Sequence, residues 1–189
     1  MSGLTAAAMV FCGGLIAYGV LSPGPEEDPK PARYAALSPA DPVRLAVPSL
    51  GVRASVVPVA LSPDAVLDPP AEVDTVGWWD ASARPGADRG QTVITGHTVH
   101  TGGGALDRLA QVEPGAKVDV VTGEGRMRYR VSRVVSLDRT AVAEQSAQIF
   151  GQGRTNGRLV LVSCTDWNGT DYERNVVVYG TPLGEPRPV

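Results

Sequence analysis

Period-two alternation of apolar and polar residues dominates the chain from residue 43 onward. Two alternating runs, Val43 to Leu50 and Arg53 to Ala60, are joined at Gly51 and predict two strands. In the second run, both faces are apolar enough to predict a partly closed sheet. Three further runs predict strands on the same grounds: Gln91 to His97, Gly157 to Cys164 and Arg174 to Gly180.

The clearest hairpin spans Lys117 to Val135, with its turn in the sequence "TGEG". Its inward face is predicted to be apolar and consists of Val118, Val120, Met127, Tyr129 and Val131. The opposite face carries three arginines: Arg126, Arg128 and Arg130. We interpret these arginines as a solvated face whose charge protects a sheet edge. An anion-binding patch is the alternative.

Helical spacing is brief by comparison. Only Ala105 to Ala110 and Thr140 to Phe150 show it, and Asp138 is a possible cap for the second segment. Several short strands without a strand–helix–strand rhythm predict a mainly β fold, a barrel or sandwich with small helices inserted.

The composition divides the chain into three parts. Residues 1–21 include the uncharged stretch Leu4 to Leu21, which is long enough to span a bilayer and predicts a signal-anchor, with a cleaved signal peptide as the alternative. Residues 22–42 are rich in proline and charge and predict an extracellular stalk. Residues 43–189 make up one domain. The net charge of -3 with scattered signs makes nucleic acid an unsuitable partner.

The two cysteines differ in setting. Cys12 lies inside the apolar N-terminal stretch and is interpreted as an unreactive thiol. Cys164 ends the run "LVLVSC" and has no partner cysteine in the predicted exported part. Exported domains use cysteines in pairs, so this unpaired one forms an intermolecular bond or is a reactive thiol, unless it is a buried core thiol.

Three strands carry a chemically useful residue at one end: His97, Cys164 and Arg174. A thiol becomes a good nucleophile once it is deprotonated, and an imidazole or guanidinium nearby favours that state. A guanidinium can also stabilise the oxyanion formed by attack on an amide, and an imidazolium can protonate the leaving amine. If the strands are neighbours, these three side chains provide a nucleophile, an oxyanion clamp and an acid.

The segments "TGHT", "LVLVSC" and "RNVVVYG" resemble the active-site segments of the sortases, membrane-anchored cysteine transpeptidases of Gram-positive bacteria. The resemblance covers nearly all of residues 43–189 and is strongest to the actinobacterial class E and class F groups. It implies an eight-stranded sortase β-barrel with short helices. By the resemblance, Cys164 is the nucleophile, His97 the general acid and Arg174 the residue that orients the substrate and steadies the oxyanion.

The resemblance also implies the partners and the place of action. The donor is a sorting-signal peptide of the LPxTG or LAxTG type, and the acceptor is an amine of a cell-wall precursor or pilin. Ser163, Thr165 and Thr98 are expected to contact the donor. No cofactor and no metal are implied, and the catalytic domain is expected outside the cell, held by a single membrane pass.

The segment before Cys164 departs from the family's usual Thr-Leu-x-Thr-Cys. Ser163 keeps the hydroxyl next to the nucleophile, whereas Val160 lacks one, which affects the expected peptide preference. Two other functions stay open. The L,D-transpeptidases also export a cysteine and a histidine, but they place glycine before the cysteine. A non-catalytic tethered β-domain could bind a cell-wall ligand, or zinc through His97, His100 and Cys164.

Overall fold

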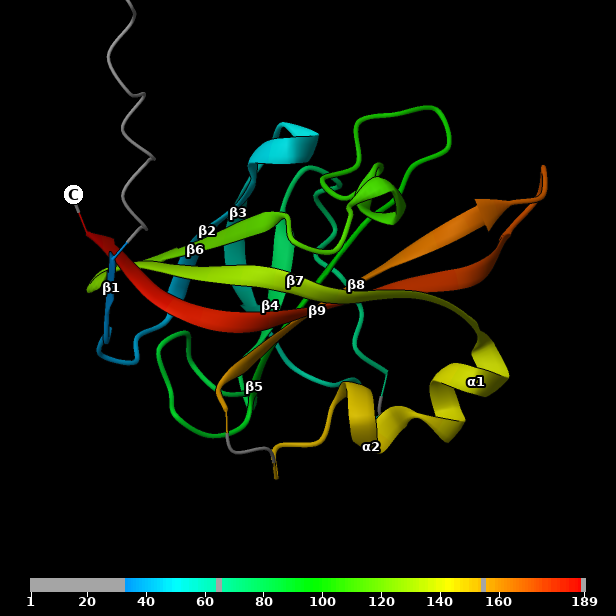
Figure 1. The fold of residues 1–189 in the computed structure, drawn as a ribbon. Coiled ribbons are helices and arrows are strands. Elements are labelled where there is room, and N and C mark those ends of the chain that lie inside the picture. Colours follow the sequence, from blue (N-terminus) through cyan, green and yellow to red (C-terminus); the bar gives the residue numbers. More distant parts are fainter. Residues whose placement is uncertain (1–32, 64–65, 154–155, 188–189) are drawn as a thin grey trace, which may run out of the picture. The chain divides into compact units, whose positions relative to one another are not determined.

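The structure of the protein is a computed structural model that describes residues 33–63, 66–153 and 156–187. Within these residues the strands follow in this order: β1 (Arg33–Ala35), β2 (Pro42–Val47), β3 (Val52–Val59), β4 (Val76–Trp79), β5 (Gln91–Gly96), β6 (Lys117–Thr122), β7 (Gly125–Asp138), β8 (Arg158–Trp167) and β9 (Tyr172–Arg187) (Figure 1). The helical segments are short: the 3-10 turns η1 (Pro48–Leu50) and η2 (Leu109–Gln111) and the helices α1 (Arg139–Glu144) and α2 (Ser146–Ile149).

The sheet closes on itself. Its strand order is β1-β9-β7-β6-β2-β3-β4-β5-β8, and β8 also pairs with β9. Strands β2 to β9 therefore form a closed eight-stranded barrel, and β1 is added to the C-terminal part of β9. This confirms the predicted mainly β barrel with short helices.

The predicted hairpin is confirmed in its turn and its faces. Val118 lies opposite Tyr129 and Val120 opposite Met127, and all four side chains are buried. The strands are joined by two residues, Gly123 and Glu124, as tight hairpins usually are.

Two apolar clusters stabilise the structure. One fills the barrel, and the other attaches the segment with α1 and α2 to the outer side of the sheet. The larger one fills the interior and includes Leu45, Ile94 and Leu161. The second lies on the outer side of β5, β8 and β9, where Val93 and Val160 pack with Ile149 of α2. Because both faces of β5 are covered, all six of its residues are buried. The strand that leads to His97 is therefore enclosed on both sides.

The helix predicted over residues 105–110 is wrong. This segment forms turns that lead into η2. The Asp107 carboxylate accepts hydrogen bonds from the backbone N–H groups of Val99 and Gly104, at 2.7 and 3.0 Å. A short polar side chain that binds nearby backbone in this way favours a turn over a helix. The apolar spacing instead buries Leu106 and Leu109 in the barrel interior.

The second helical segment is confirmed, in two pieces. α1 and α2 are separated at Gln145. Asp138 caps α1 as predicted, because its carboxylate accepts a hydrogen bond from the N–H of Ala141 at 2.8 Å.

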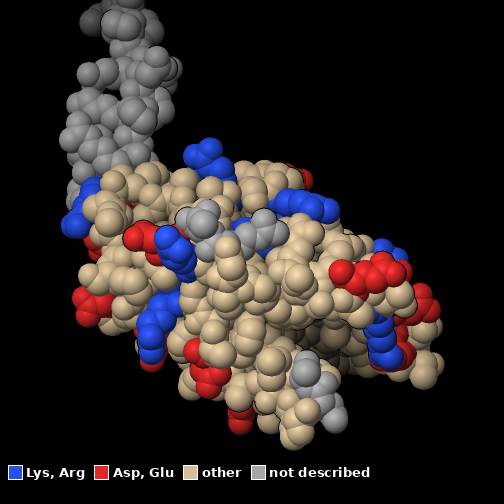
Figure 2. All heavy atoms as spheres, turned by 90° about the horizontal axis from the view of Figure 1, so that it is seen from below, with Lys and Arg blue, Asp and Glu red and all other residues tan. Residues whose placement is uncertain are grey.

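Residues 33–41 belong to the predicted stalk, yet they contact the barrel. β1 pairs with β9, and Leu37 is buried in the larger cluster. The predicted membrane segment 1–21 lies outside the described residues. The helices that the structure does describe are too short or too polar to span a membrane. Basic and acidic side chains are interspersed on the face of the molecule shown in Figure 2, as the sequence predicted.

Candidate active site

Three neighbouring strands bring His97, Cys164 and Arg174 to the same end of the barrel. β5 and β8 run parallel with Thr95 opposite Val162, so His97 and Cys164, each two residues further on, lie level with each other. β8 and β9 are antiparallel, and Thr165 lies opposite Arg174. The register thus places the three residues at one end of three neighbouring strands, with Cys164 itself opposite Asn175, the residue after Arg174.

Cys164 is exposed to solvent near the end of β8, which excludes the buried core thiol that the sequence left open. Neighbouring groups nevertheless shield the sulfur enough to raise the pKa of the Cys164 thiol above its ordinary value. The Asp171 carboxylate raises this pKa further, and the Arg139 guanidinium lowers it. At neutral pH the resting site therefore holds a thiol rather than a thiolate.

His97 is half-buried immediately after β5. Its Nε2 lies 2.7 Å from the backbone carbonyl oxygen of Pro70. A carbonyl oxygen can only accept, so Nε2 carries the hydrogen in this bond. A neutral His97 imidazole then has its free acceptor at Nδ1, which is the atom able to take a proton.

Arg174 is fixed near the start of β9 by its neighbour strand β7. Its Nε donates to the Ser136 hydroxyl at 2.7 Å, and Nη2 donates to the Ser136 carbonyl at 2.6 Å. The Asp166 carboxylate lies 3.4 Å from Nε. Among the described residues, no hydrogen bond uses Nη1. The guanidinium is thus oriented by internal contacts while part of its donor set stays available.

Asp166 has a backbone conformation that non-glycine residues rarely adopt. Its φ is 60°, in the left-handed region, two residues after Cys164. Such conformations carry a cost and persist where surrounding contacts impose them. Its ion pair with Arg174 is one such contact.

Ser163, next to Cys164, is buried and links two of the site's strands. Its hydroxyl donates to the Gly96 carbonyl at 2.7 Å and also lies 2.7 Å from the Thr98 hydroxyl. Thr165 is half-buried and makes a long 3.4 Å contact to Asp166. Contact of Ser163, Thr98 and Thr165 with a peptide stays a prediction. In this structure the Ser163 and Thr98 hydroxyls bind each other and the backbone.

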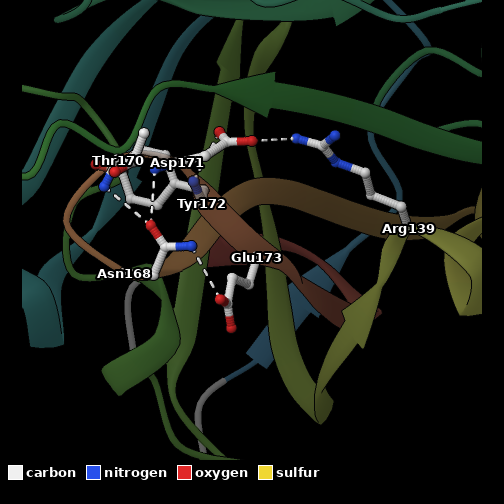
Figure 3. A network of polar contacts seen from close by, with 6 residues as sticks. All are labelled: Arg139, Asn168, Thr170, Asp171, Tyr172 and Glu173. Carbon is white, nitrogen blue, oxygen red and sulfur yellow. Dashed lines mark hydrogen bonds and ion pairs between the residues drawn. The ribbon is translucent and has the colours of Figure 1, made fainter.

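The connection between β8 and β9 holds a polar network that the sequence analysis did not anticipate (Figure 3). Asn168 accepts hydrogen bonds from the N–H groups of Thr170 and Asp171, both at 2.9 Å. The Asp171 carboxylate reaches outward to Arg139 at 2.7 Å. This network ties the β8–β9 turn to the start of α1. The "NGTD" motif signals the turn, but nothing in the sequence pairs Asp171 with Arg139.

An aromatic stack lies over the same connection. The His100 ring is parallel to Trp167, with centroids 4.1 Å apart, and Tyr172 packs against Trp167 at 5.0 Å. The stack joins the loop after His97 to the β8–β9 turn. Among the residues that the structure describes, no group of three His, Cys, Asp or Glu side chains could hold a metal ion.

The solved structures that resemble this chain share its fold. Sortase C of Streptococcus pneumoniae aligns with a TM-score of 0.61 and 14% identity, over 79% of this chain and 70% of that one. Sortase C-1 of Actinomyces oris aligns with a TM-score of 0.59 and 19% identity, over 76% and 75% of the two chains. Sortase C2 of Group B Streptococcus pilus island 1 gives a TM-score of 0.58 and 19% identity, over 74% and 72%.

A comparison with curated protein sequences finds no match. The family model of the sortase domain, in contrast, matches residues 45–183, nearly the whole barrel. That span includes His97, Cys164 and Arg174 and the strand ends that carry them. The assignment to class E or class F stays a prediction. The chain belongs to the sortase family.

Proposed function

We propose that this sortase cleaves an LPxTG-like or LAxTG-like sorting signal through a thioester on Cys164 and transfers the acyl group to an amine of a cell-wall precursor or pilin. The observation that supports the proposal is the position of His97, Cys164 and Arg174 at the same end of three neighbouring strands, with Cys164 exposed to solvent. The resemblance of the three segments to sortase active sites supports the roles given to each residue.

The raised pKa of the Cys164 thiol suggests the first step of the reaction. The sulfur starts as a thiol, so its proton leaves as the reaction begins. His97 accepts it at Nδ1, because Nε2 is already bonded to Pro70. The sulfur then attacks the carbonyl carbon of the scissile amide, and a tetrahedral oxyanion forms.

Arg174 stabilises that oxyanion in the proposed reaction. In this proposal its Nη1 group donates hydrogen bonds to the oxyanion, while Ser136 binds Nε and Nη2 on the other edge of the guanidinium. Collapse of the intermediate breaks the C–N bond, and the His97 imidazolium protonates the leaving amine. An acceptor amine next attacks the thioester carbon, loses its proton to His97 and releases Cys164 as a thiol.

We also propose that the reaction takes place outside the cell. The uncharged stretch Leu4 to Leu21 serves as the membrane anchor in this proposal, and the residues that follow act as the stalk. The sorting signal then comes from a secreted protein that has crossed the same membrane.

The test uses a fluorogenic LPxTG or LAxTG peptide with and without diglycine as the acceptor. Cys164→Ala should abolish both cleavage and transfer, and mass spectrometry should find the acyl adduct only on the unaltered protein. Arg174→Ala should slow acylation strongly, whereas Arg84→Ala, which removes an exposed arginine from a distant ion pair, should not. His97→Ala should lose activity. His100→Ala, which removes the neighbouring imidazole, is the matched control and should keep it. Full activity of Cys164→Ala would end the proposal.

A further inference from the structure

A basic groove lies on the outer face of β2, β3, β6 and β7, away from the residues assigned to catalysis. It is a hollow of about 390 Å³, within the size range of small-ligand sites. Four arginines line it: Arg44, Arg53, Arg126 and Arg128. Asp119 is the one carboxylate among its lining residues. We call this set the arginine groove.

The sheet register explains why the arginines gather there. Ala46 of β2 lies opposite both Arg53 of β3 and Asp119 of β6, and Asp119 lies opposite Arg128 of β7. One row across four strands is therefore arginine, alanine, aspartate, arginine. The small Ala46 leaves space between the long side chains, which makes the floor of the groove.

The next row, two residues along each strand, adds two more arginines, on β2 and β7. Arg44 of β2 lies opposite Val121 of β6, and Val121 lies opposite Arg126 of β7. All these residues point to the same side, because side chains two apart share a face. Arginines thus come from β2, β3 and β7, and Ala46, Val121 and the buried Asp119 lie between them.

The charges in the groove do not balance. Buried Asp119 binds Arg128 through two contacts of 2.6 and 2.7 Å and lies 3.6 Å from Arg126. The Asp119 carboxylate raises the pKa of Arg128, so it fixes that guanidinium in its charged state and in one orientation. Arg44 and Arg53 are exposed and have no ion pair among the described residues. One buried carboxylate thus faces four guanidinium groups, in a chain whose net charge is -3.

We propose that the arginine groove binds a phosphate ester. A guanidinium offers parallel N–H donors that match the oxygens of a phosphate, and Arg128 is already oriented by Asp119. A single carboxylate ligand would neutralise one arginine only, whereas a multiply charged oxyanion meets the excess of positive charge. The apolar floor, which includes Ala46 and Val121, suits the carbon part of the ester.

Two sources can present this chemistry, a phospholipid headgroup and a soluble phosphate compound. Both are tested with the full chain in a nonionic detergent by titration calorimetry. The probes are inorganic pyrophosphate, short-chain dihexanoyl phosphatidic acid below its micellar concentration, and the matching phosphatidylcholine as the lipid with no net charge.

The variants separate the groove from general surface charge. Arg44→Gln/Arg53→Gln removes the two arginines that lack an internal partner, and both side chains are exposed, so the fold should persist. Arg84→Gln/Arg89→Gln removes the same charge from an exposed loop outside the groove and is the matched control. Ala46→Glu is a second probe, since it places a carboxylate on the floor and keeps every arginine.

The expected result is saturable binding of pyrophosphate that weakens as salt is added. Affinity should fall at least tenfold in Arg44→Gln/Arg53→Gln and in Ala46→Glu, and stay within twofold in the control. If phosphatidic acid binds more tightly than pyrophosphate and phosphatidylcholine does not bind, the lipid headgroup is the source. If pyrophosphate binds more tightly than phosphatidic acid, the source is a soluble phosphate. Absence of saturable binding of both anionic probes, or an equal loss in the control, would overturn the proposal.

Discussion

Removal of the Ser163 hydroxyl should measurably lower the free energy of unfolding of the whole domain. It is buried and joins β8 to the end of β5 through the Gly96 carbonyl and the Thr98 hydroxyl, each at 2.7 Å. Ser163→Ala removes both bonds and leaves the Gly96 carbonyl without this donor. A buried hydrogen bond contributes about 1 kcal/mol net, and an unsatisfied partner adds to the loss.

We therefore expect Ser163→Ala to lower the free energy of unfolding by about 1–2 kcal/mol. For a chain of this size, that corresponds to a fall in melting temperature of about 3–6 °C. Urea unfolding followed by tryptophan fluorescence measures it directly. Ser55→Ala is the matched control, because Ser55 is exposed on β3, and its unfolding free energy should change by less than about 0.5 kcal/mol.

A double-mutant cycle with Thr98→Val tests the link between the two hydroxyls. The second substitution should cost about 0.5–1 kcal/mol less when Ser163 is already alanine, since the shared bond is then absent. If Ser163→Ala unfolds like the unaltered protein, or if the two losses simply add, then the hydroxyl does not connect the strands energetically and the reasoning is refuted.

Two further predictions concern the thiol and the backbone. Asp171→Asn should lower the pKa of Cys164, because it removes the carboxylate that disfavours the thiolate, and Arg139→Gln should raise it. The rate of iodoacetamide alkylation, measured as a function of pH, should have a lower midpoint in Asp171→Asn and a higher midpoint in Arg139→Gln than in the unaltered protein. Identical profiles would contradict the assignment. Gly157→Ala should destabilise the protein by more than about 2 kcal/mol, because φ is +54° and the new Cβ would lie 1.9 Å from the Ala87 carbonyl oxygen. Thermal unfolding checks it, with Gly123→Ala, where a Cβ meets nothing within 4 Å, as the variant expected to unfold normally.

The sequence predicts the parts of the fold that have strong local patterns. The β6–β7 hairpin is recognised from its alternation and its tight turn, and its inward residues are those predicted. β4 was missed because "VGWW" does not alternate and is buried over most of its length. β1 was missed because three residues carry no periodicity, and their pairing with β9 is fixed by contacts distant in the chain.

The candidate site shows the same division between local and long-range information. His97, Cys164 and Arg174 stand out because each lies at the end of an apolar run. Their mutual alignment depends on the parallel pairing of β5 with β8, which no local pattern encodes. The Arg139–Asp171 ion pair and the stacking of His100 on Trp167 also join distant segments, so the sequence analysis could not find them.

The small strand β1 has a mechanical consequence for any pull applied to the chain upstream of Arg33. Among the strands that the structure describes, β1 pairs with β9 alone and is not one of the eight that close the barrel. A pulling force applied there therefore detaches the three residues of β1 before it acts on the closed barrel. Their release yields about 10 Å of slack. The domain can thus gain reach without disturbing the strand ends that hold its reactive sulfur.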